Sequence, residues 1–243
     1  MNAILQFNKR KYETPLEMLG RLRIEQPYLQ NEKLSYLGRL DPLAHGIMLV
    51  AVGEVNKDRE KYLGLPKTYN VKFLFGMSTD TGDLLGFIKN VQDGAHVDRK
   101  KIEKDILSLK GKHKLLYPLY SSKTVNGKPL HEYGREGKDV ILPERDMEVL
   151  SVHIKDAENI QSEKIFEAAI YAVENVKGDF RQEMIRKIWE EFLGQHTGKN
   201  FLMVETILFV TGGTYIRSLA DLLAEKTGIP CLAFDIERTE IFL

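Results

Sequence analysis

The chain has 243 residues, of which 43% are hydrophobic and 29% are charged, with 35 basic and 35 acidic side chains. This length can bury a sizeable core, and the composition is typical of an ordinary soluble globular protein. No apolar run approaches the roughly 18 to 20 residues of a membrane helix, and the first residues lack a basic region followed by an apolar run. A single cysteine, Cys231, excludes an internal disulfide, and no zinc-ligand spacing is present. The sequence therefore predicts a metal-free, cytoplasmic protein.

The zero net charge argues mildly against a nucleic-acid partner, because neutralising phosphates supplies much of the affinity for RNA. Charges can nevertheless segregate to one face of a fold. The locally basic stretches 57–61 and 98–114 are interpreted as solvated faces.

In chain order, residues 15–25 have apolar positions at helical spacing and predict a helix. Asp41 followed by Pro42 is a helix-start signal, because Asp caps a helix and Pro fits its first position. The run 47–52 is rich in β-forming residues. Residues 69–75 and 88–91 predict strands on either side of a turn-rich loop, 76–86.

The second half predicts a helix over 99–109, strands over 146–154 and 201–210, and a helix over 216–226 closed by Gly228. Residues 162–195 hold two amphipathic helical patterns separated by Gly178 and Asp179. They predict a helical hairpin inserted between two strands, more often a packed decoration than a surface for a partner or RNA. We expect an α+β fold, with a mixed, largely antiparallel sheet flanked by helices, in one domain over 1–243.

Three segments could carry chemistry. Residues 38–46 surround Asp41, which on its own is more often a helix cap than a nucleophile. Residues 79–83 contain one copy of the Asp-Thr-Gly triplet of aspartic proteases, which need two such carboxylates, so a turn is favoured. Residues 212–219 come after a predicted strand. They begin with two glycines and continue into a predicted helix, a geometry that can present a Tyr and an Arg to a cleft.

Together and in this order, these segments resemble the TruB family of pseudouridine synthases. The resemblance spans about residues 8–241, outside the helical insertion. The matching segments are 39–46 (Arg-Leu-Asp-Pro-Leu-Ala-His-Gly), 67–71 (Lys-Thr-Tyr-Asn-Val), 79–83 (Thr-Asp-Thr-Gly-Asp), 118–122 (Pro-Leu-Tyr-Ser-Ser), 126–128 and 135–137, 213–219 (Gly-Thr-Tyr-Ile-Arg-Ser-Leu) and 236–239 (Ile-Glu-Arg-Thr).

The resemblance implies a catalytic site made of Asp41, Tyr69 and Arg217, in which the guanidinium keeps the carboxylate ionised. It implies further contacts to substrate from Tyr215, Leu40, Ile236, Lys9 and His45.

Several positions depart from the family pattern. Residues 9–15 keep only Lys9 and Thr14 of the usual opening motif, Tyr36 stands where a histidine is frequent, and Glu237 replaces the first arginine of the last motif. These changes leave the expected reaction centre intact and affect RNA contacts. The C-terminal RNA-binding (PUA) domain of many members is expected to be absent.

The activity implied is isomerisation of uridine to pseudouridine in RNA by a monomer, without cofactor or metal. The substrate implied is the T-loop uridine (position 55) of tRNA. One alternative is the same reaction on another RNA or with a protein partner. Others are a non-catalytic RNA-binding or RNA-folding protein and, more remotely, a protease built on Asp80.

Overall fold

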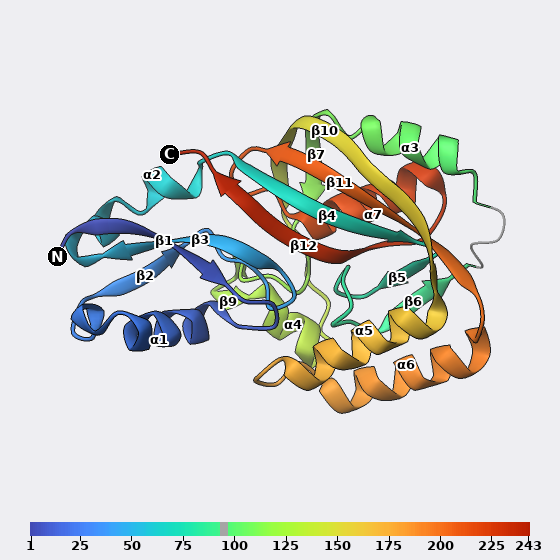
Figure 1. Ribbon diagram of the computed structural model, residues 1–243, viewed down its shortest axis with the longest axis horizontal. Helices are drawn as coiled ribbons and strands as arrows, with labels where there is room; N and C mark the ends of the chain where they lie inside the picture. Colours follow the sequence, from blue (N-terminus) through green and yellow to red (C-terminus); the bar gives the residue numbers. More distant parts are fainter. Residues whose placement is uncertain (93–96) are drawn as a thin grey trace.

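The computed structural model describes residues 1–92 and 97–243 (Figure 1). The strands are β1 (Ala3–Lys9), β2 (Leu34–Leu37), β3 (His45–Val52), β4 (Lys67–Phe75), β5 (Met77–Thr79), β6 (Ile88–Val91), β7 (Gly111–Leu116), β8 (Thr124–Val125), β9 (Lys128–Pro129), β10 (Glu144–Gln161), β11 (Asn200–Val210) and β12 (Cys231–Ile241). The helices are α1 (Pro15–Glu25), α2 (Glu60–Leu63), α3 (Arg99–Leu107), α4 (Leu130–Glu136), α5 (Ser162–Asn175), α6 (Gln182–His196) and α7 (Ile216–Thr227), with 3₁₀ helices η1 (Pro27–Leu29) and η2 (Gly53–Asp58).

One eight-stranded sheet runs through the molecule in the order β1-β3-β12-β4-β11-β10-β7, with β2 paired to β3. Its pairings are antiparallel except that between β12 and β3, which is parallel. The expected α+β class with a mixed, largely antiparallel sheet is confirmed. The parallel pairing matters for the site because it brings the start of β3 beside the last strand of the chain.

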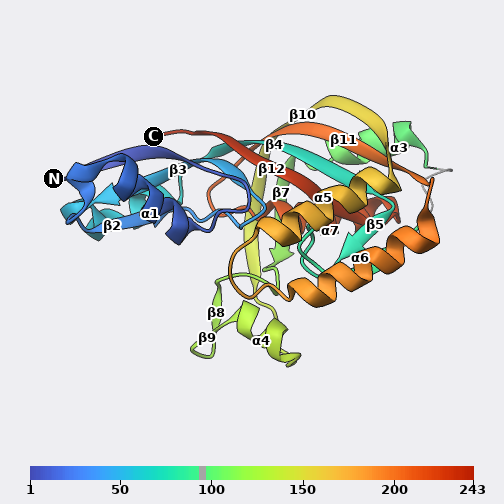
Figure 2. The ribbon, with the colours of Figure 1, turned by 60° about the horizontal axis from the view of Figure 1, so that its bottom comes forward.

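Helices cover both faces of this sheet. Side chains alternate between the two faces along a strand, so neighbouring residues of one strand pack against different helices. On β11, Leu202 and Val204 join the core that contains the α7 residue Leu219. Their neighbours Phe201 and Met203 join a second core with α5 and α6. Figures 1 and 2 show α5 and α6 as two adjacent helices leaving the end of β10 and returning to β11.

The expected helices at 15–25 and 216–226 are present, and their ends follow the local chemistry. Thr14 and Glu17 form a capping box at the start of α1, with Pro15 at its first position. Gly228 closes α7 in the left-handed conformation, with φ of 73°. The helix expected over 99–109 ends at Leu107, and the two helices expected within 162–195 are α5 and α6.

The helix start predicted at Asp41 is wrong, because residues 38–44 form a loop and β3 begins at His45. Tertiary hydrogen bonds take the carbonyls that a helix would use. The carbonyl of Pro42 accepts from the Tyr12 amide at 2.7 Å, and Lys9 Nζ donates to the carbonyls of Pro42 and Ala44. Within 76–86, expected to be a loop, residues 77–79 form the short strand β5 against β6.

The hairpin core gives a stability prediction. Trp189 is fully buried in α6, whereas Met184 on the same helix is 58% exposed. We expect Trp189→Ala to lower the free energy of unfolding by about 3–5 kcal/mol, because a large cavity remains. We expect Met184→Ala to change it by less than about 0.5 kcal/mol. Urea unfolding measures both, and equal losses would contradict this account of the core.

Candidate active site

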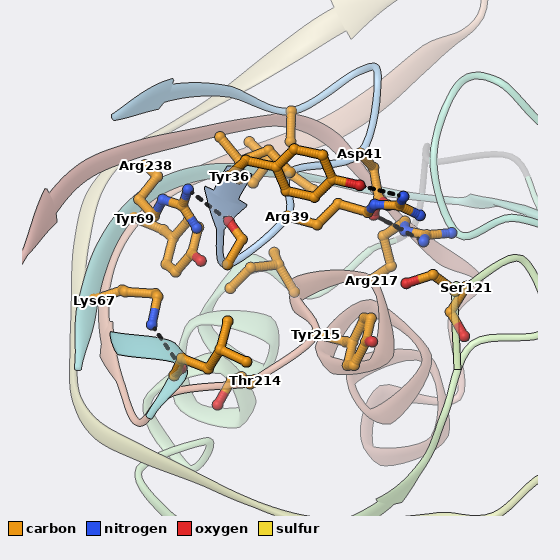
Figure 3. A pocket seen from close by; sticks show the side chains of 18 of the residues that line it. Tyr36, Arg39, Asp41, Lys67, Tyr69, Ser121, Thr214, Tyr215, Arg217 and Arg238 are labelled. Atoms are coloured by element: carbon orange, nitrogen blue, oxygen red, sulfur yellow. Dashed lines mark hydrogen bonds and ion pairs between the residues drawn. The ribbon is translucent and has the colours of Figure 1, made fainter. Parts of the chain in front are cut away.

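A cavity of about 640 Å³ opens between the 38–44 loop, the first residues of β4, the N-terminus of α7 and β12. Six of the eight residues expected in the site line it: Asp41, Tyr69, Arg217, Tyr215, Leu40 and Ile236. Figure 3 shows Asp41 and Arg217 joined on one side, with Tyr215 below Arg217, and Tyr69 with Lys67 on the other side. The volume lies in the range of ordinary small-molecule pockets.

The guanidinium of Arg217 lines this cavity and also a second one, of about 300 Å³, which shares Asp41 with the first and is lined by Thr81 and Tyr120. Its Nε and Nη2 lie 2.9 and 2.8 Å from Asp41 Oδ2. Its Nη1 donates to the carbonyl of Thr81 at 2.7 Å, and its Nη2 donates to the carbonyl of Tyr120 at 3.0 Å. The planar fork of an arginine suits such a set of acceptors, so Arg217 fixes Asp41 in position.

A second carboxylate, Asp83, lies 3.8 Å from Arg217 Nε. Burial raises the pKa of Asp83, although Arg217 opposes that shift. Burial disfavours the charged form of Arg217, but Asp41 and Asp83 outweigh it, so the pKa of Arg217 is raised. The side chain of Asp41 is 30% exposed and that of Asp83 only 6%. Asp41 is therefore the carboxylate that faces the cavity and can reach a substrate.

The turn before α7 explains how Arg217 and Tyr215 reach the cavity. Gly213 has φ of 81°, in the left-handed region that favours glycine. The chain can then begin α7 with both side chains at its first turn. The ring of Tyr215 packs edge-on against Tyr117 with centroids 5.5 Å apart. Burial, with Asp41 nearby, raises the pKa of the Tyr215 hydroxyl and keeps it neutral.

The opposite wall comes from two paired strands. Tyr69 of β4 lies opposite Arg238 of β12, and Val71 lies opposite Ile236. Positions two apart share a face, so Tyr69 and Ile236 point to the same side. Tyr69 and Ile236 are nearly fully buried, at 5% and 4% exposure. They provide an aromatic and an aliphatic surface of the kind that holds a nucleobase.

Sequence reasoning assigned no role to several charged residues of this cavity. Burial lowers the pKa of Lys67 to about 8, and its ammonium donates to the carbonyls of Leu63 and Leu65. Arg238 is almost fully buried and donates to the carbonyls of Ile47 and Gly38. Lys67 and Arg238 fall within segments that carried the resemblance, which was the only available signal. The lining has six basic side chains and two acidic ones, so positive charge is concentrated here in a neutral chain.

The other two expected residues, Lys9 and His45, do not line the cavity. Lys9 is fully buried, and its ammonium donates to the carbonyls of Arg10, Pro42 and Ala44 at 3.0, 3.2 and 2.6 Å. This places Lys9 behind the loop that carries Asp41, with no open path to a substrate. His45 Nε2 lies 3.4 Å from Asp235 Oδ1.

The geometry gives no support to a protease built on Asp80. Both of its oxygens accept hydrogen bonds from the guanidinium of Arg181, at 2.6 and 3.3 Å, and Oδ1 also accepts from the Phe87 amide. In the turn that follows, Asp83 Oδ1 accepts from the Leu85 amide, as in an Asx turn. Asp80 therefore has a structural role, whereas Asp83 of the same segment lies beside Arg217.

The described parts of the chain, 1–92 and 97–243, contain no group of three or more His, Cys, Asp or Glu placed to hold a metal ion. Within those same ranges, no helix has both the length and the apolar character needed to cross a bilayer.

Residues 26–169 match the family model described as TruB family pseudouridylate synthase (N terminal domain). The chain therefore belongs to this family. The match contains Asp41, Tyr69 and Asp83 and ends within α5.

Individual relatives carry the name tRNA pseudouridine synthase B. The protein of Clostridium kluyveri is 31% identical over 158 residues, covering 65% of this chain and 53% of its own. That of Bacillus subtilis is 28% identical over 240 residues, covering 98% of this chain and 65% of its own. The chain thus spans between about half and two thirds of the length of these relatives.

Among solved structures, the chain is similar to one in a Cbf5-Nop10-Gar1 complex. The TM-score is 0.59 at 17% identity, over 98% of this chain and 48% of the other. It is also similar to one in an H/ACA RNP bound to a substrate RNA containing 2'-deoxyuridine. There the TM-score is 0.55 at 16% identity, over 98% of this chain and 47% of the other. At these identities the likeness establishes the fold.

The buried lysine behind the Asp41 loop gives a pH prediction. Burial lowers the pKa of Lys9 to about 8, from 10.5 in the unfolded chain. Between these values the folded state has lost the proton while the unfolded state keeps it, so this lysine raises the stability as the pH rises. We expect the unfolding free energy of the wild type, relative to Lys9→Met, to increase by on the order of 3 kcal/mol from pH 8 to 10.5.

Urea unfolding at a series of pH values measures this difference. A difference that stays constant with pH, or falls, would show that Lys9 keeps its proton in the folded protein. Lys67→Met is a useful second variant, because the pKa of Lys67 is lowered for the same reason.

Proposed function

We propose that this protein is an RNA pseudouridine synthase that isomerises the T-loop uridine (position 55) of tRNA, with Asp41 as the catalytic carboxylate. The observation that carries the proposal is the position of Asp41, which is fixed by Arg217 at the edge of a cavity walled by Tyr69 and Ile236. Membership in the TruB family and the names of the bacterial relatives support the same assignment.

The reaction breaks the bond between C1′ and N1 of the uridine, turns the uracil, and joins C1′ to C5. N1 gains a proton and C5 loses one, so the overall change is an isomerisation and needs no external oxidant or reductant. An ionised carboxylate serves in two alternative ways, by attacking C1′ or by removing a proton from the sugar. In both, Arg217 holds the carboxylate in place beside the cavity.

The target uridine must leave its stack to reach the cavity. Tyr69 offers a ring against which the uracil can stack, worth about 1–3 kcal/mol, and its hydroxyl is suited to receive the C5 proton. Ile236 and Leu40 complete the apolar part of the wall. Ser121 also lines the cavity, and its hydroxyl is buried without a hydrogen-bond partner within the described residues.

The positive lining supports a polyanionic substrate in spite of the zero net charge. Arg39, Arg59 and Arg145 surround the cavity together with the buried Lys67, Arg217 and Arg238. Their charge can attract the RNA backbone while the T-loop presents a splayed base, which is how single-stranded RNA is usually recognised. We assign the activity to residues 1–243 as one catalytic domain, acting as a monomer in the cytoplasm, with the α5–α6 hairpin as an insertion.

Tritium release from a [5-³H]uridine-labelled tRNA transcript tests the proposal. We expect the wild type to release tritium and Asp41→Asn to lose at least about a thousandfold in rate. We expect the RNA dissociation constant of this variant to stay within a few fold, since the amide keeps the size of the side chain. The matched control is Asp146→Asn, because Asp146 is exposed on β10 and lies outside the cavity.

Substantial turnover by Asp41→Asn would refute the role of Asp41. Release from another labelled RNA but not from tRNA would keep the reaction and change the substrate. Tight binding without release from any RNA would leave the alternative of an RNA-binding or RNA-folding protein.

A further inference from the structure

The tip of the α5–α6 hairpin carries an arginine in an unusual backbone conformation. Arg181 has φ of 61°, in the left-handed region that residues other than glycine seldom adopt. Its carbonyl starts α6 by accepting from the amides of Met184 and Ile185 at 3.1 and 3.0 Å. A strained residue of this kind persists where its surroundings hold it in place.

Those surroundings lie at the second cavity, of about 300 Å³, which Arg181 and Tyr120 line together with Asp41 and Arg217. The guanidinium of Arg181 makes its two hydrogen bonds to Asp80, and it lies between the rings of Phe87 and Tyr120, 4.0 and 4.3 Å from their centroids. The side chains of Arg181 and Asp80 are only 17% and 16% exposed. Partial burial makes this ion pair stronger than an ordinary surface pair.

The two segments that Arg181 holds are the same two that hold Arg217. Asp80 precedes Thr81, whose carbonyl accepts from Arg217 Nη1. Tyr120 stacks on Arg181 with its ring, and its own carbonyl accepts from Arg217 Nη2. The hairpin is therefore connected to the Asp41–Arg217 pair through two short backbone paths.

The charge of the hairpin disfavours a different role, a direct grip on RNA. Residues 162–196 contain seven acidic and five basic side chains, and one of the five is the engaged Arg181. A surface with this balance does not attract phosphates. The tip is fastened on a further side, because Arg135 Nη2 donates to the carbonyl of Asp179 at 2.8 Å.

From these contacts we propose that Arg181 is a positioning residue, which sets the carbonyls of Thr81 and Tyr120 so that Arg217 holds Asp41 in its reactive place. This rests on the proposed function for its effect on rate, but its structural part stands alone. The hairpin then supports the catalytic site, although none of the expected site residues lies within it.

The test compares Arg181→Ala and Arg181→Lys with Arg186→Ala, a control on the outer side of α6 whose side chain is 40% exposed and pairs with Glu174. Single-turnover rates at saturating tRNA should fall about 10–100-fold in Arg181→Ala, with the RNA dissociation constant within about threefold. The rate of Arg181→Lys should lie between those of the wild type and Arg181→Ala, because lysine keeps the charge but loses the planar fork and the stacking on the rings. Arg186→Ala should match the wild type.

Amide hydrogen exchange on the free protein gives the second readout. Residues 79–87 and 117–123 should exchange faster in Arg181→Ala, and neither should change in Arg186→Ala. Unchanged exchange in both segments, an unchanged rate, or a loss confined to RNA affinity would each overturn the proposal. If Arg181→Ala does not fold, Arg181→Lys carries both measurements. A wild type inactive on every RNA would defeat the proposed function alone, since the exchange experiment needs no activity.

Discussion

The buried guanidinium of Arg217 is the interaction on which the site depends. Its hydrogen bonds reach Asp41 in the loop before β3, Thr81 in the turn after β5, and Tyr120 before β8. These segments are far apart in the sequence and have no regular secondary structure at these positions. A charged side chain that is 4% exposed would be costly without such partners. The fold supplies the partners, and all three line the second cavity, which shares Asp41 and Arg217 with the first.

Two further cations, Lys9 and Arg181, hold the segments that Arg217 joins. Lys9 holds the carbonyls of the Asp41 loop, and Arg181 holds the Asp80–Thr81 turn and Tyr120. Lys9 is fully buried behind its loop, whereas Arg181 lines a second cavity that shares Asp41 and Arg217 with the first. A site built on loops can be placed accurately when such outer contacts lock the loops, and here those contacts are made by side chains from β1 and from the α5–α6 hairpin.

Much of the fold could be predicted because its signals are local. The α1 capping box, Gly228 after α7 and the alternation along β4 each depend on a few neighbouring residues. The Asp41-Pro42 pair wrongly predicted a helix start because this signal is also local. The conformation of the loop is set instead by tertiary hydrogen bonds from Lys9 and Tyr12. The strands β1, β2, β7 and β12 were not foreseen, since their pairing partners lie elsewhere in the chain.

Six of the eight residues that the order of the short motifs singled out line the cavity. Lys9 was assigned to substrate because a motif position does not say whether a side chain faces the cavity or the interior. Asp83, Lys67 and Arg238 carried no separate signal, and burial is what distinguishes them. Arg181 lies in a segment where helical periodicity was the only readable pattern.

The most direct test of this account is the rate of the chemical step in Arg217→Lys, compared with wild type and Arg217→Ala under single turnover. A lysine keeps the positive charge beside Asp41 but cannot reach Asp41, Thr81 and Tyr120 together. The account predicts that Arg217→Lys is slowed more than about 100-fold, close to Arg217→Ala, with RNA affinity largely kept. A rate within a few fold of wild type would mean that charge alone suffices, and would contradict the central role given to the Arg217 fork.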